Sequence, residues 1–131
     1  MNTPMPYAEM LRVQLRKRHR RAPVKNLAFE PGPEGFLEGD IIAIVTADDS
    51  SVYRFYADRV ELPNSVKVSY DSVSDYHWIT KTTEGRIKAA MKQEHYGTLI
   101  LETKAGESYE MTGLNQAVFP IMSFFRWCLL K

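Results

Sequence analysis

Apolar and polar residues alternate through the middle of the chain with the two-residue period of β-strands. Five stretches between residues 41 and 79 show this alternation or a short apolar run, and polar turns separate them: 41–46, 52–57, 59–62, 66–70 and 72–79. Two more stretches, 98–103 and 107–111, flank a turn that contains Gly106, a residue type that tight hairpin turns favour. The pattern therefore predicts about seven short antiparallel strands.

The N-terminal region and one internal stretch have the longer apolar period of a helix. Residues 5–21 place apolar side chains at four-residue spacing and begin with a proline that suits a first helical turn: Pro6, Tyr7, Leu11 and Leu15. Residues 82–95 predict a shorter helix that begins near Thr82 or Thr83 and is weakened by Gly85.

The last eighteen residues, 114–131, predict the most apolar helix of the chain, with Asn115 as its N-cap. Pro120 removes one helical hydrogen bond, so we expect a bend or a late start there. One predicted stripe consists of Val118, Ile121, Met122, Phe125 and Leu129, and Phe124, Trp127 and Cys128 widen it. One face can cover the strands, and the excess can pack on the N-terminal helix or on a second copy. Phe124, Trp127 and Leu130 are the candidates for such an interaction surface, so a homo-oligomer remains an alternative.

These elements predict an α+β fold that is mostly antiparallel β, with one apolar helix covering a small β-structure. The strands, the segment 66–79 and the final strand–hairpin–helix stretch resemble the pleckstrin-homology-like superfold, including its bacterial members, over about residues 36–131. The resemblance implies two sheets, or a partly open barrel, closed by the C-terminal helix, and a binding or scaffolding role. Members that bind phosphoinositides carry clustered cations near the first hairpin. Here that loop contains Asp48 and Asp49, with only Arg54 nearby, so phosphoinositide binding is not expected.

Length and composition indicate one folded domain. The chain has 131 residues, an ordinary apolar and charged content and one cysteine, which excludes an internal disulfide. We expect Cys128 to be a buried apolar side chain. No apolar run is long enough to span a bilayer, and we expect a cytoplasmic protein.

Charge is distributed unevenly along the sequence. Residues 1–25 carry seven basic and one acidic side chain, a net +6, whereas residues 26–131 carry ten basic and fifteen acidic ones, a net −5. We therefore expect a basic N-terminal helical arm, 1–25, on a single β domain, 26–131. The candidate binding residues are the cations of this arm: Arg12, Arg16, Lys17, Arg18, Arg20 and Arg21. An acidic protein surface, the chain's own acidic body, nucleic acid, anionic lipid or no partner at all remain alternatives.

No catalytic, metal or cofactor motif stands out. His77 follows Asp75 by two residues and Asp71 by six, which gives only a weak acid–base alternative. The adjacent Asp48 and Asp49 are typical of a turn. We therefore expect no metal and no cofactor, and a non-enzymatic adaptor that works through protein contacts. A nucleic-acid-associated protein that uses residues 12–21 is the alternative.

Overall fold

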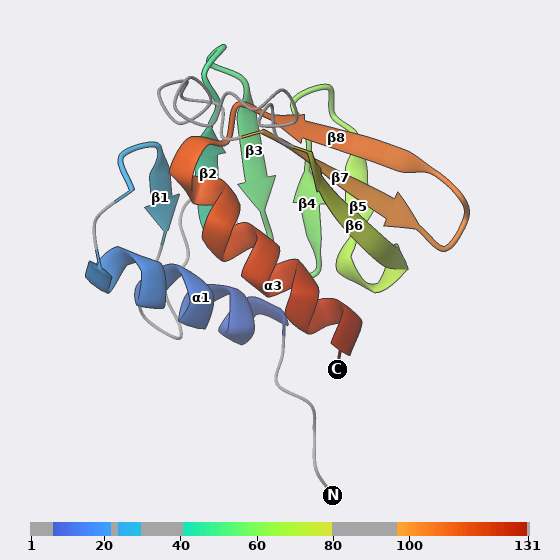
Figure 1. Ribbon diagram of the computed structural model, residues 1–131, viewed down its shortest axis with the longest axis horizontal. Helices are drawn as coiled ribbons and strands as arrows, with labels where there is room; N and C mark the ends of the chain where they lie inside the picture. Colours follow the sequence, from blue (N-terminus) through green and yellow to red (C-terminus); the bar gives the residue numbers. More distant parts are fainter. Residues whose placement is uncertain (1–6, 22–23, 30–40, 80–96, 131) are drawn as a thin grey trace, which may run out of the picture.

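The computed structural model describes residues 7–21, 24–29, 41–79 and 97–130. Two helices lie together over one side of the strands (Figure 1). The helices are α1, Tyr7–Arg21, and α3, Val118–Leu130. The helix expected at 82–95 lies outside the described residues.

Eight described strands form two antiparallel sheets. The five-stranded sheet has the order β1-β2-β3-β4-β5, and its strands are Leu27–Phe29, Ala43–Thr46, Val52–Phe55, Arg59–Glu61 and Lys67–Ser69. The three-stranded sheet has the order β6-β7-β8, and its strands are Val73–Ile79, Thr98–Thr103 and Ser108–Thr112. The α+β class and the antiparallel strands are confirmed. The described strands form separate sheets and no closed barrel.

Two backbone connections between described segments join the sheets. A 3-10 turn, Tyr70–Ser72, links β5 directly to β6. At the other place, the turn after β2 contacts the end of β8, where the amide of Asp48 donates to the carbonyl of Gly113 over 3.1 Å. Gly113 has φ of +70° and an added Cβ would lie 3.0 Å from the Asp48 nitrogen, so this crossing favours glycine.

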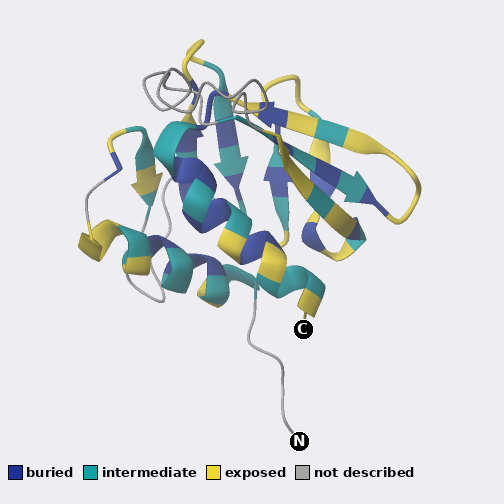
Figure 2. Cartoon of the chain, viewed as in Figure 1, coloured by how far each residue is buried: buried dark blue, intermediate teal, exposed yellow. Residues whose placement is uncertain are grey.

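One continuous core joins the helices and the sheets, and buried residues recur along both helices and most of the described strands (Figure 2). Its largest fully buried side chains include Tyr70, Phe55, Phe124 and Phe125. The aromatic C-terminal helix therefore covers the strands, as expected. Leu11 and Leu15 of α1 are also fully buried in this core. The helix predicted as a basic arm is thus packed on the domain and contributes to its interior.

The start of α3 differs from the prediction. A 3-10 turn, Asn115–Ala117, precedes the α-helix, and Val118 is its first residue. Asn115 does not act as the N-cap, because its Oδ1 accepts no hydrogen bond among the described residues; its side-chain amide instead donates to Asp48 Oδ1 over 2.7 Å. Because the α-helix begins at Val118, Pro120 lies in its first turn, where its missing N–H costs no helical hydrogen bond. The expectation of a late start is confirmed.

Candidate functional site

The sequence of α1 has a buried side and a basic side. Leu11 and Leu15 are four residues apart and face the core, as the 3.6-residue helical period requires. The outer side carries exposed Lys17, His19, Arg20 and Arg21, whereas Arg16 and Arg18 are half-buried. Arg12 is only 4% exposed, so it lies inside the domain and is not part of an accessible binding surface.

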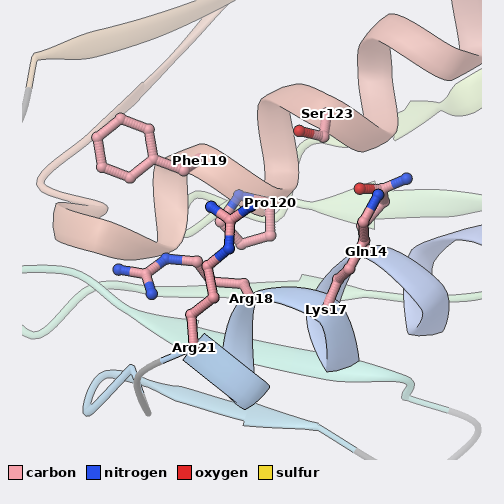
Figure 3. Close-up of a pocket in the computed structure, with 7 residues that line it drawn as sticks. All are labelled: Gln14, Lys17, Arg18, Arg21, Phe119, Pro120 and Ser123. Atoms are coloured by element: carbon pink, nitrogen blue, oxygen red, sulfur yellow. The ribbon is translucent and has the colours of Figure 1, made fainter.

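A shallow groove of about 170 Å³ runs between the C-terminal half of α1 and the first turns of α3 (Figure 3). It is lined by cations and polar groups of α1 and by the start of α3: Gln14, Lys17, Arg18, Arg21, Phe119, Pro120 and Ser123. We call this set the basic groove. Arg18 is held there because its Nη2 donates to Gln116 Oε1 over 3.0 Å, a contact between residues 98 positions apart.

Two cations of the basic groove, Lys17 and Arg21, form no ion pair with a carboxylate in the described ranges, and neither does Arg20 beside them. Cations in the last turn of α1 interact favourably with the negative end of the helix dipole, worth about 0.3–1 kcal/mol each. That effect accounts for cations at this end of the helix. It does not require Arg18 and Arg21 of the last turn, together with Lys17 just before it, to line the same groove.

An aromatic pair borders the basic groove. Phe119 lines it, and the ring of Trp78 from β6 packs edge-on against Phe119 with centroids 5.7 Å apart at 80°. Trp78 is 40% exposed. The groove therefore offers positive charge, a hydroxyl from Ser123 and apolar ring surface within one small area.

The interaction surface predicted on α3 is largely inside the molecule. Phe124 is fully buried and packs its ring against Tyr70 with centroids 4.9 Å apart, so it does not belong to an exposed surface. Trp127 is half-buried, 5.8 Å from the ring of Tyr7. Leu130, at 75% exposure, is the one of the three that is largely exposed. The excess apolar face of α3 is thus covered mainly by α1. Cys128 is also only half-buried, not fully buried as expected.

The acidic residues of the turn after β2, Asp71 and His77 do not form one site. Asp49 Oδ1 accepts a hydrogen bond from the Ser51 amide over 2.9 Å, and hydrogen bonds from Ser51 lower the pKa of this exposed carboxyl. This is the turn chemistry that the sequence predicted. Asp71 accepts a hydrogen bond from the Tyr7 hydroxyl over 2.6 Å. His77 instead lies near Asp75 and Glu102, 3.7 and 3.1 Å away.

Among the residues of the basic groove, the sequence predicted Lys17, Arg18 and Arg21 as binding residues but gave no indication of Gln14, Phe119 or Ser123. Part of the signal was available, because Gln14, Lys17 or Arg18, and Arg21 recur at helical spacing on one face. The α3 contribution depends on which helices pack together, and the sequence alone did not determine that.

Comparison of the chain with family models, curated proteins and solved structures finds no match. Within the described residues, neither helix has the length and apolar character needed to cross a bilayer.

Proposed function

We propose that this chain is a non-enzymatic binding domain that docks an acidic segment of a partner protein in the basic groove. The observation that carries the proposal is the convergence of Lys17, Arg18 and Arg21 on a groove that Phe119 and Pro120 also line. Guanidinium groups bind carboxylates through paired hydrogen bonds, and the two apolar lining residues suit an apolar neighbour on the same segment.

The extent of positive charge favours a protein partner over a long nucleic acid. The fifteen residues of α1 span only about 22 Å. A DNA duplex carries one charge per ~1.7 Å of axis, so most phosphates would extend beyond the helix. The rest of the chain, residues 26–131, has a net charge of −5 (10 − 15) and would repel them. A short acidic peptide requires only the groove.

Nucleic acid remains the second candidate function, and the aromatic pair is the observation that favours it. Single strands bind where cations follow the backbone and bases stack on aromatic rings. Phe119 in the groove and the partly exposed Trp78 beside it supply such rings. This small surface would contact only a short segment of a single strand.

The test measures binding of two fluorescent probes, a glutamate-rich peptide and a single-stranded oligonucleotide, by anisotropy over a salt series. The variant Lys17→Gln/Arg21→Gln removes two groove charges. The matched control Lys67→Gln/Lys104→Gln removes two exposed charges from β5 and the β7–β8 turn. We expect the groove variant to weaken peptide binding roughly tenfold, or about 1.4 kcal/mol, because each partly exposed pair contributes under about 1 kcal/mol. The control variant should bind like the wild type.

Other outcomes separate the candidates. Oligonucleotide binding with a steep salt dependence that is lost in the groove variant, without peptide binding, would replace the first function by the second. Equal weakening in the groove variant and the control would show non-specific attraction and contradict both. Absence of binding to either probe at low salt would also exclude both.

A further inference from the structure

A second group of functional side chains lies on the three-stranded sheet, away from the basic groove. β6 and β7 are antiparallel neighbours, and their register places Asp75 opposite Glu102 and His77 opposite Ile100. Asp75 and His77 are two residues apart on one strand, so they lie on the same face. The three side chains Asp75, His77 and Glu102 therefore meet on the outer face of the sheet, and we call them the β6–β7 cluster.

The ligand atoms of this cluster converge on one point. His77 Nε2 lies 3.1 Å from Glu102 Oε2 and 3.7 Å from Asp75 Oδ2, and all three ligand atoms lie within 4.8 Å of one another. A tetrahedral zinc ion with bonds near 2.0–2.2 Å separates its ligand atoms by about 3.4 Å. These two separations lie on either side of that value, and the third, between the two carboxylate oxygens, is at most 4.8 Å. Small rotations of exposed side chains suffice to equalise them.

We propose that the β6–β7 cluster is a binding site for a divalent transition-metal ion of the zinc class. One imidazole nitrogen and two carboxylate oxygens are a donor set that zinc accepts, with water in the remaining position. The imidazole separates this site from calcium and magnesium sites, which use oxygen ligands. The sequence alone predicts no metal site, because Glu102 is 25 positions from His77 and adjacent to it only through strand pairing.

The pairing of β6 with β7 fixes the backbone positions of the three ligand residues before any ion binds. All three ligands come from paired strands, not from loops, so their backbone positions are fixed by the ladder between β6 and β7. Their side chains remain accessible, with exposed fractions of 47% for His77, 53% for Asp75 and 43% for Glu102. The alternative is an exposed ion pair, which contributes little to stability and holds no metal. This inference is independent of the proposed function, since no residue of the basic groove belongs to the cluster.

The experiment is a calorimetric titration of the full chain with Zn²⁺, repeated with Co²⁺ so that absorption reports the coordination geometry. The variants are His77→Ala, Asp75→Asn and Glu102→Gln. Glu110→Gln is the matched control: Glu110 is exposed on β8 opposite Ile100 and stands outside the cluster. Since the cluster residues are exposed, we expect all variants to fold, and circular dichroism verifies this.

The proposal expects one ion per chain, a tetrahedral cobalt spectrum, and a loss of affinity of about tenfold or more in each of the three variants. The control should retain wild-type affinity. Absence of zinc and cobalt binding would overturn the proposal. Binding that survives both carboxylate substitutions, or that weakens equally in Glu110→Gln, would also overturn it, because the ion would then be held elsewhere or by general negative charge.

Discussion

At the scale of single residues, Tyr70 connects the aromatic helix to the sheets. Its hydroxyl donates to the carbonyl of Tyr56 over 2.7 Å, and its ring packs on Phe124 at 4.9 Å and on Tyr7 at 5.4 Å. The side chain is almost completely buried. Burial raises the pKa of the Tyr70 phenol well above its ordinary value, because the phenolate would lose its hydration inside the core.

This raised pKa predicts alkaline destabilisation through Tyr70. In the unfolded chain a tyrosine ionises near pH 10, whereas the folded chain keeps Tyr70 protonated. Stability from this group is therefore complete below about pH 10 and falls as pH rises toward the folded pKa, by up to about 1.4 kcal/mol per pH unit. Tyr70→Phe removes the hydrogen bond to Tyr56, so its free energy of unfolding at pH 7 should be lower by about 0.5–1.5 kcal/mol. Above about pH 10 the free energy of unfolding of this variant should fall less steeply than that of the wild type. Urea unfolding between pH 7 and 11 measures both. Parallel pH curves for the two proteins would contradict the assignment.

At the scale of elements, local patterns predicted most strands and both described helices. The sequence placed 52–57, 59–62, 66–70, 72–79, 98–103 and 107–111 close to β3 through β8. It missed β1, because Leu27–Phe29 is too short to show a period and its strand character depends on pairing with β2. The division of the strands into two sheets also depends on long-range pairing, which alternation cannot reveal.

In the candidate sites too, residues that are close in sequence were predicted, whereas residues that come together only through the fold were not. The cations of α1 are close together in sequence and were predicted from the excess of basic residues in 1–25. The basic groove also requires Phe119 and Ser123, about one hundred positions away, and the β6–β7 cluster requires Glu102. Arg12 illustrates the opposite error. It was predicted as a binding residue because it is one of the cations of the N-terminal region, yet its position on the helix places it on the buried side.

The start of α3 gives a prediction at this scale. Pro120 is the third residue of the helix, where no N–H bond is lost, whereas Met122 is the fifth, where its N–H bonds to the Val118 carbonyl in a regular α-helix. Met122→Pro should therefore destabilise the domain by about 3 kcal/mol or more. Pro120→Ala should cost only about 0.4–1 kcal/mol, chiefly by freeing the unfolded chain, plus any packing lost at this buried residue. Thermal unfolding of both variants provides the measurement. Similar losses in the two variants would show that the helix does not begin at Val118.

At the scale of the whole molecule, charge and packing assign two roles to α1. Its outer side provides cations to the basic groove, and its inner side provides Leu11 and Leu15 to the same core as α3 and the sheets. A separate arm, as the sequence predicted, would leave the rest of the domain folded when removed. A shared core predicts a different result, because α1 and α3 cover each other (Figure 1).

Removal of residues 1–21 therefore tests whether the domain needs α1 to fold. Truncating a buried leucine to alanine costs about 2–5 kcal/mol, and a whole domain has only about 5–15 kcal/mol of stability. Losing Leu11 and Leu15 together, with the cover over Tyr70 and Phe124, should thus abolish cooperative unfolding and the near-ultraviolet circular dichroism of the buried aromatics. Full-length Leu11→Ala/Leu15→Ala should show a large part of this loss. Full-length Lys17→Ala/Arg20→Ala, which removes only exposed cations of the same helix, should stay close to the wild type. If the truncated chain unfolds cooperatively at the wild-type temperature, α1 is an arm after all and its leucines do not support the core.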